Sequence, residues 1–139
     1  MTVKYVYSNV DPDCLLLSYI KKEDIISERI DLSPERECLQ VSAKKINMGK
    51  IFKPHKHNAL ERNTDQTNES WMFLEGSVRA NFYDLDDTLI LQEVFKSGDC
   101  VVVFNAGHGF DVLEDNTILY EFKNGPYYGQ IADKTFIEG

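Results

Sequence analysis

The sequence has no apolar run near the roughly 20 residues that a membrane-spanning helix needs. Its longest candidates, Cys14–Leu17 and Cys100–Phe104, span only four and five residues. The first 13 residues also lack the long apolar stretch that forms the core of a secretory signal peptide. We therefore expect a cytoplasmic protein with no membrane partner.

Cysteine and basic residues are both scarce. The three cysteines, Cys14, Cys38 and Cys100, are odd in number and form no closely spaced pair. This pattern predicts reduced core residues and neither a disulfide framework nor a zinc knot. Fifteen Lys and Arg stand against 23 Asp and Glu, which gives a formal net charge of -8. Nucleic-acid binding needs a broad positive surface, so we expect no nucleic-acid partner.

The chain also lacks internal repeats, low-complexity tracts and Pro/Gly/Ser linkers, which predicts one domain over residues 1–139. What it contains is a series of short runs rich in Val, Ile, Tyr and Phe and bounded by Gly, Asp or Asn. These expected strands are Lys4–Tyr7, Leu15–Ile20, Ile25–Leu32, Leu39–Ile46, Glu69–Leu74, Val78–Tyr83, Leu89–Phe95, Cys100–Phe104, Phe110–Leu113 and Thr117–Phe122. Many short strands in a chain of this size predict an all-β sandwich or barrel.

Two of the three histidines form the sequence His55-Lys56-His57. On an extended segment, residues i and i+2 project to the same face, so both imidazoles can reach one point. Pro54 fits the first residue of a strand or an edge strand, because it has no N–H to donate to a ladder. Two imidazoles suit zinc, iron, nickel or copper, and a carboxylate would complete the set of ligands.

Glu69 is the better carboxylate candidate because it opens an expected strand that can lie beside the histidines. Glu61 is nearer to them in sequence but sits in a polar stretch, residues 58–68. The third histidine, His108, lies between Gly107 and Gly109, whose freedom would let the backbone turn its imidazole into a cavity.

In these residues the chain resembles the cupin superfamily. That family's first motif is a glycine, five residues, His-x-His, three or four residues, a glutamate, six residues and a glycine. Gly49 followed by five residues and then His55 matches the first half of it. Glu69 followed by six residues and then Gly76 matches the second half. Eleven residues separate His57 from Glu69, so the loop between the two halves is longer here than in the family.

Two departures from the family's pattern leave alternatives open. Glu61 has the short spacing after His57 but no glycine seven residues later, so it is the fallback as ligand or an acid/base near the metal. The second cupin motif is a glycine, five residues, Pro-x-Gly, two residues and a histidine. Gly98 begins it well, but Phe104 replaces the proline, and His108 comes one residue early.

The resemblance covers about residues 39–122 and implies a double-stranded β-helix, or jelly roll, with extra N-terminal strands. It implies a divalent transition metal (iron, zinc, nickel or manganese) held by His55, His57, Glu69 and His108. It also implies a homodimer, since small cupins commonly pair through exposed sheet edges. Strand alternation places Trp71 and Phe73 on the face of Glu69, where they would line a substrate pocket or simply pack in the core.

Residues 44–62 hold six basic residues and one acidic residue. A basic rim beside a metal cavity suits a small anionic substrate, and we expect Arg62, with its guanidinium fork, to bind it. Near the chain's end, the turn at residues 124–129 carries Tyr127 and Tyr128, and a tyrosine there could donate a proton.

Since cupins include several reaction classes, the fold does not choose the reaction. The first hypothesis is a sugar or nucleotide-sugar isomerase or epimerase, in which Glu61 or Tyr128 moves the proton. It rests on a similarity to small cupins associated with surface-polysaccharide biosynthesis. The alternatives are a non-haem iron dioxygenase and a binding module that holds a metal or sugar without turnover.

Overall fold

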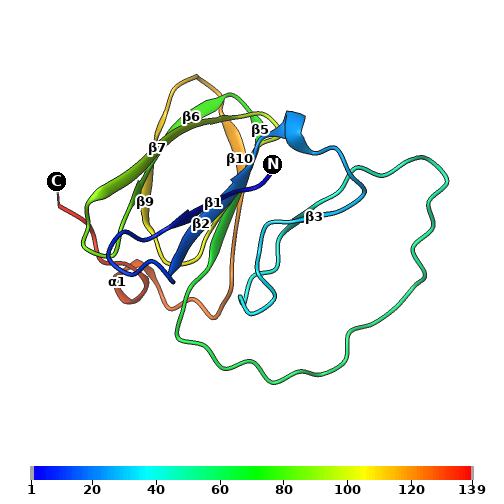
Figure 1. Ribbon diagram of the computed structural model, residues 1–139, viewed down its shortest axis with the longest axis horizontal. Coiled ribbons are helices and arrows are strands. Elements are labelled where there is room, and N and C mark those ends of the chain that lie inside the picture. The colour runs from blue at the N-terminus through cyan, green and yellow to red at the C-terminus, as the bar shows by residue number, and fades with distance from the viewer. Residues whose placement is uncertain (1, 139) are drawn as a thin grey trace.

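The computed structural model describes residues 2–138, and its regular structure is almost entirely antiparallel β-sheet (Figure 1). The elements in chain order are β1 (Lys4–Tyr7), β2 (Leu15–Ile20), η1 (Lys22–Asp24), β3 (Ile30–Asp31), β4 (Ser42–Ala43), β5 (Glu69–Glu75), β6 (Ser77–Tyr83), β7 (Leu89–Lys96), β8 (Cys100–Val103), β9 (Gly107–Val112), β10 (Ile118–Lys123) and α1 (Gln130–Asp133). The all-β prediction is confirmed. Neither described helix is long and apolar enough to cross a membrane.

Two sheets pack face to face around one core. The larger has the strand order β1-β2-β8-β5-β10, and the smaller has the order β7-β6-β9. Trp71 and Phe73 of the larger sheet share this core with Val78 and Phe82 of the smaller one. Their burial follows from strand alternation, which turns every second side chain of β5 and β6 inward.

The two sheets do not close into a barrel. The larger sheet ends at β10 and the smaller ends at β9, and each of these strands pairs with only one neighbour among residues 2–138. The β-rich part of the expected fold is therefore present, but an unpaired edge remains on both β9 and β10.

The N-terminal region extends and covers the larger sheet, as the strand pattern predicts. Strands β1 and β2 add to the sheet beside β8. Residues 25–43 then pass over its outer face, where Leu32 is fully buried beside Ile20 and Val102.

Residues 44–68 form a long loop with no helix or strand, and in Figure 1 it swings away from both sheets. The expected strands over residues 25–32 and 39–46 are accordingly reduced to the two-residue pair β3 and β4. The expected strand that starts at Pro54 is absent. An alternating sequence gives a segment only a preference for extended backbone, and a strand forms where a neighbour accepts its hydrogen bonds.

Two acidic side chains buried in turns connect distant parts of the chain. Asp99, which follows β7, accepts hydrogen bonds from the backbone N–H groups of Lys22 and Lys96, both at 2.9 Å. Asp84, which follows β6, accepts from the Ser8 hydroxyl and the Asn9 backbone N–H. Both carboxylates replace water with donors from the protein, which allows their burial.

Candidate functional site

A cavity of about 680 Å³ is lined by residues of β9 and β10, an edge strand of each of the two sheets. Its walls come from β5, β9 and β10, and the C-terminal residues 133–137 close one side. The charged or titratable side chains that line it include Glu69, His108, Glu121, Lys123, Asp133 and Lys134, and Thr67, Tyr83 and Thr135 add hydroxyl groups.

The pairing register of the strands explains why these side chains converge. Lys123 lies opposite Glu69, and Glu121 lies opposite Trp71, so all four point to the same face of the larger sheet. His108 lies opposite the buried Phe82 in the smaller sheet and therefore faces inward from the other side. The site is therefore assembled by the pairing of strands that are distant in the sequence.

Glu69 and His108 form an ion pair, with 2.5 Å between Oε2 and Nε2. The Glu69 side chain is only 9% exposed and that of His108 is 31% exposed. Burial by itself would raise the pKa of Glu69, but hydrogen bonds with His108 and Glu121 lower it to about 2. Burial would lower the pKa of His108, but the hydrogen bond and the charge of Glu69 outweigh it and raise this pKa. Both shifts favour the charged forms, a carboxylate at Glu69 and an imidazolium at His108.

Glu121 stands beside this pair at the solvent-exposed side of the cavity. Its hydrogen bond with Glu69 is the largest cause that raises the pKa of Glu121, and burial adds to it. Trp71 donates a hydrogen bond from Nε1 to Glu121 at 3.4 Å. Two adjacent carboxyl groups with opposite pKa shifts can hold and release a proton, which is the chemistry of a general acid or base.

Trp71 forms an aromatic wall behind the polar groups. Its ring is 2% exposed and meets His108 edge-on at 5.2 Å and Phe110 at 5.1 Å between centroids. Phe73 lies deeper, stacked on Phe95 at 5.6 Å, and is not in the cavity wall. The sequence pattern left two roles open for these rings, pocket lining and core packing. In the structure Trp71 lines the cavity, and Phe73 packs in the core.

The histidine pair lies outside this cavity. His55 and His57 have ring centroids 5.3 Å apart in the long loop, and His55 Nδ1 lies 3.0 Å from the Lys53 carbonyl oxygen. Within residues 2–138, no group of three or more His, Cys, Asp or Glu side chains is arranged to hold a metal ion. The predicted ligands therefore separate into two pairs: Glu69 with His108 in the cavity, and His55 with His57 in the loop.

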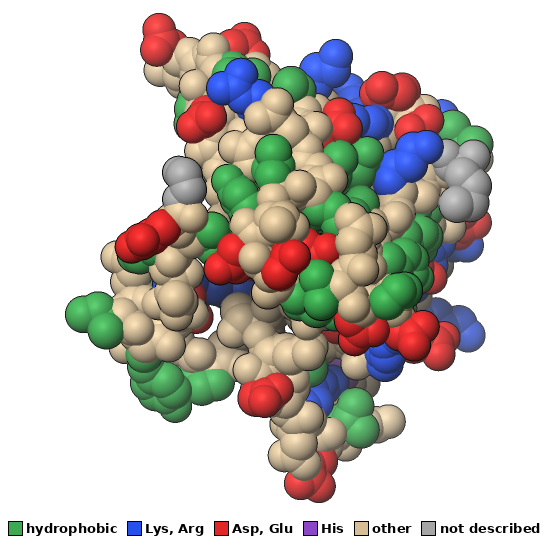
Figure 2. Space-filling view, turned by 60° about the vertical axis from the view of Figure 1, so that its left-hand side comes forward, with side chains coloured by type: hydrophobic (Ala, Val, Ile, Leu, Met, Phe, Trp, Pro, Cys, Tyr) green, Lys and Arg blue, Asp and Glu red, His purple; other side chains and the backbone are tan. Residues whose placement is uncertain are grey.

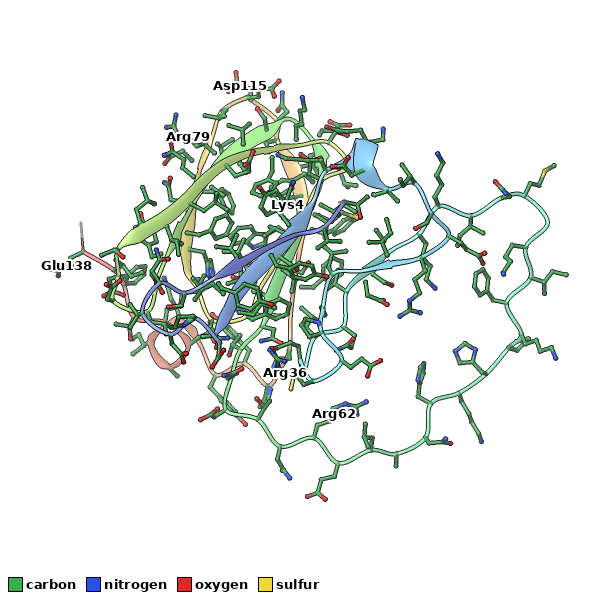
Figure 3. All side chains as sticks on the ribbon, in the orientation of Figure 1. Lys4, Arg36, Arg62, Arg79, Asp115 and Glu138 are labelled. Atoms are coloured by element: carbon green, nitrogen blue, oxygen red, sulfur yellow. The ribbon has the colours of Figure 1, made fainter. Side chains whose placement is uncertain are left out.

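Three other predicted site residues also lie apart from the cavity. The Glu61 carboxylate accepts a hydrogen bond from Asn63 at 3.2 Å within the loop. Arg62 donates to the Leu60 carbonyl at 3.3 Å, and Figure 3 shows it on the loop, well away from the sheets. Tyr128 is 82% exposed and does not line the cavity.

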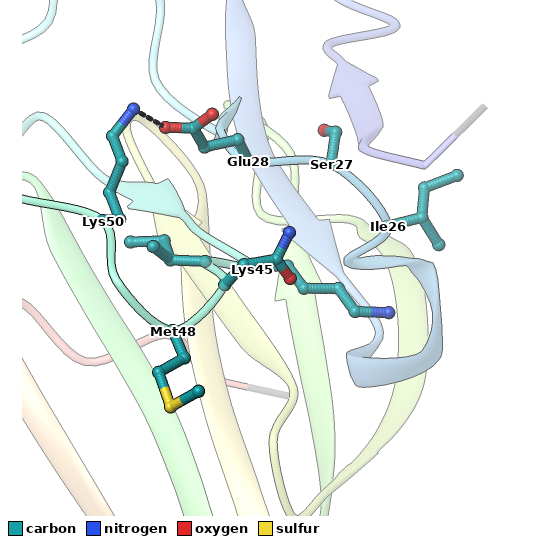
Figure 4. A pocket seen from close by; sticks show the side chains of 8 residues that line it. Ile26, Ser27, Glu28, Lys45, Met48 and Lys50 are labelled. Carbon is teal, nitrogen blue, oxygen red and sulfur yellow. Dashed lines mark ion pairs between the residues drawn. The ribbon is translucent and has the colours of Figure 1, made fainter.

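A second, shallower cavity of about 420 Å³ lies between residues 26–28 and 45–50 (Figure 4). Its polar groups include Lys45 and the ion pair between Lys50 and Glu28, 2.5 Å apart. Lys45 and Lys50 therefore line this surface hollow and not the cavity beside His108.

Sequence reasoning missed Lys123, a cation that lines the main cavity. Lys123 lies one residue past the end of the expected strand Thr117–Phe122, and its Nζ is 3.3 Å from Asp133 Oδ2. The two-residue spacing of Glu121 and Lys123 was the available signal, because it places both on one face of a strand.

Comparison of the chain with protein-family models, with curated proteins and with solved structures finds no match.

Proposed function

We propose that this chain is a metal-binding cupin that acts on a small anionic or carbohydrate substrate, as a sugar or nucleotide-sugar isomerase or epimerase. One observation carries the proposal. Glu69 and His108, each from a different one of the two cupin-like motifs, form an ion pair in the same cavity. The meeting of these two motif residues in one cavity supports the interpretation that both motifs belong to one site.

The finer fold that we propose is a jelly roll completed by the long loop. The edges of β9 and β10 are unpaired and flank the cavity, and residues 44–68 directly precede β5. The same loop exposes Ile51, Phe52 and Leu60, which a docked strand could bury. Pairing of residues 51–57 with β9 would bring His55 and His57 toward His108.

A carboxylate and three imidazoles form a donor set that suits a divalent transition metal. His55, His57, Glu69 and His108 would hold the metal, which would supply a Lewis acid for a substrate carbonyl. Glu121 would move the proton, because its carboxyl group already faces the cavity. Glu61 and Tyr128 remain predictions for the same role, and each would require its own segment to move to the cavity. Trp71 would exclude water from one side of the substrate.

Metal content tests the ligand set. Untagged wild-type protein should carry about one transition-metal equivalent by elemental analysis. His55→Ala, His57→Ala and His108→Ala should each lose most of this metal, because each substitution removes one imidazole ligand. Lys56→Ala is the matched control, since residue 56 projects to the opposite face of an extended segment. Equal metal content in all of these proteins would overturn the metal site.

Solvent exchange tests the reaction. Metal-loaded protein incubated in D₂O with a panel of sugar phosphates and nucleotide sugars should incorporate deuterium at a carbon next to a carbonyl, measured by NMR. Glu121→Gln should reduce the rate by about 10² to 10⁴-fold while leaving metal content unchanged. Oxygen uptake without exchange would favour a dioxygenase. Tight binding with neither exchange nor oxygen uptake would favour a non-catalytic module.

A further inference from the structure

The C-terminal segment, residues 130–138, covers one side of the cavity, and two of its side chains contact β9 and β10. Asp133 pairs with Lys123, and the Ile137 side chain lies against Gly107. Most of the segment's other side chains face solvent, with Ile131 99% and Phe136 75% exposed. A segment with so little buried surface can separate from the protein without disturbing the sheets.

The Ile137 side chain occupies the space that a side chain at residue 107 would need. A Cβ atom at residue 107 would lie 2.3 Å from Ile137 Cδ1 and 3.1 Å from Tyr83 Cβ. The backbone at Gly107 does not have the left-handed φ that disfavours other residues, so glycine is needed here for space. Because the nearest obstacle is the tip of a flexible side chain, Gly107→Ala should displace Ile137 and leave β9 in place.

Asp133 is the anion that balances Lys123. The two side chains are 23% and 19% exposed and lie 3.3 Å apart, and the Lys123 ammonium also lies 4.3 Å from the Tyr127 ring centroid. The other acidic groups near Lys123 are already engaged, because Glu69 pairs with His108 and Glu121 shares a hydrogen bond with Glu69. Removal of Asp133 would take away the carboxylate that forms an ion pair with Lys123, and only the more distant charges of Glu69 and Glu121 would still act on that ammonium.

We propose that residues 130–138 are a displaceable cover and that Asp133 occupies the position where the anionic group of the substrate binds Lys123. This inference rests on the cavity of the proposed function and adds the residue that recognises the substrate's charge. A phosphate or a carboxylate on a sugar would compete with Asp133 for the ammonium group, and binding would open the cover. An uncharged sugar has no group to make this exchange.

Binding measurements test the exchange directly. Glucose 1-phosphate and glucuronate serve as the two anionic probes, and glucose is the uncharged control. If the cover is closed in about nine of ten molecules, Asp133→Asn should tighten binding of an anionic probe about tenfold by calorimetry. Lys123→Met should weaken it at least tenfold. Two controls should bind the probes as the wild type does. Asp115→Asn lies in the turn between β9 and β10, and Lys96→Met lies at the end of β7, and neither residue lines the cavity.

Trp71, the only tryptophan, reports the position of the cover because it lines the cavity. Acrylamide should quench its fluorescence several-fold more effectively in Gly107→Ala and Asp133→Asn than in the wild type. Glucose 1-phosphate should have the same effect on the wild type if phosphate is the preferred anion, and glucuronate if it is carboxylate. Near-ultraviolet circular dichroism checks that each variant is folded.

Unchanged or weaker anion binding by Asp133→Asn would overturn the cover, and so would wild-type affinity in Lys123→Met. Metal content measured on the same preparations separates this result from the proposed function. Protein without metal that still shows the Asp133→Asn gain would retain the cover and contradict the metal site. Metal-loaded protein without that gain would retain the metal site and contradict the cover.

Discussion

At the scale of single residues, the site depends on groups that change each other's protonation. Glu69 contacts both His108 and Glu121, so the carboxylate that stabilises an imidazolium also favours a proton on its neighbour. Within this group, the Glu69 carboxylate, the His108 imidazole and the Glu121 carboxyl can together serve acid and base chemistry at a single pH.

This coupling predicts how stability depends on pH. Glu69 has a lowered pKa, so its contribution is complete above its ordinary value of 4.5 and is lost as the pH falls toward about 2. His108 has a raised pKa, so its contribution is complete below its ordinary value of 6.5 and is lost as the pH rises through the raised value. In metal-free protein, the ion pair should therefore stabilise the fold most between those two ordinary values.

Urea denaturation at several pH values measures the effect. The wild type should exceed His108→Gln by about 2 kcal/mol in free energy of unfolding near pH 5.5, and by much less near pH 9. A difference between the two proteins that does not vary with pH would show that the ion pair is not formed in solution.

Asp99 gives a second prediction at this scale. Its side chain is 1% exposed and accepts hydrogen bonds from two backbone N–H groups. Asp99→Ala removes the acceptor of both N–H groups and should lower the free energy of unfolding by about 2–3 kcal/mol. Asp115→Ala, in the exposed turn between β9 and β10, should change it by less than about 0.5 kcal/mol. Chemical denaturation of both variants makes the comparison, and equal losses would remove the role assigned to Asp99.

At the scale of elements, the free edge of β9 and the loop of residues 44–68 could pair with each other. A free strand edge presents N–H and C=O groups that another segment can pair with, and a segment of the same chain needs no second molecule. If metal links His55 and His57 to the cavity, residues 51–57 must approach β9, and the backbone of that edge becomes protected.

Hydrogen–deuterium exchange tests this movement. Addition of Zn²⁺ to metal-free protein should slow exchange in residues 51–57 and in the β9 amides that point away from β6. His57→Ala should show little slowing, and Lys56→Ala should behave as the wild type. Slow exchange confined to β5 and β10 after Zn²⁺ addition would place the loop elsewhere.

Most elements could be predicted from the sequence because their signals are local. Strands β1, β2 and β5–β8 lie within about one residue of their expected bounds, since alternation and turn residues act over a few positions. Residues 39–46 have a similar pattern but form only β4, because pairing depends on a neighbour that the pattern does not contain. Lys123 and Asp133 were missed for a related reason, since their meeting depends on the path of the C-terminal segment.

At the scale of the whole molecule, charge is unevenly distributed along the chain. Residues 44–62 carry six of the 15 basic residues, and the structure places them in the loop and around the smaller cavity. Acidic side chains are spread over the face of the protein in Figure 2. Docking of the loop would therefore bring basic residues of positions 44–62 closer to the main cavity, where they would attract anions.

Exposed aromatic side chains on the edge strand β10 predict that the protein self-associates. Tyr120 and Phe122, 55% and 51% exposed, lie 6.2 Å apart on the outer face of the edge strand β10. The homodimer expected from the cupin resemblance would bury such an edge. Sedimentation velocity should show a dimer, and Phe122→Glu should raise the dissociation constant at least tenfold by placing a charge in the interface.

Leu85→Glu, in the turn after β6, is a control with a similarly exposed apolar side chain and should remain dimeric. A monomeric wild type at high micromolar concentration would contradict the prediction.

The position of β2 has a consequence for how the chain is made. Its inner partner is β8, with Leu17 opposite Val103, so most of the protein must be synthesised before that pairing is possible. The β6–β7 hairpin can form as soon as it leaves the ribosome, whereas β1 and β2 must wait with an apolar edge uncovered. We therefore expect the apolar side chains of β2 to stay uncovered on the nascent chain until β8 has been synthesised.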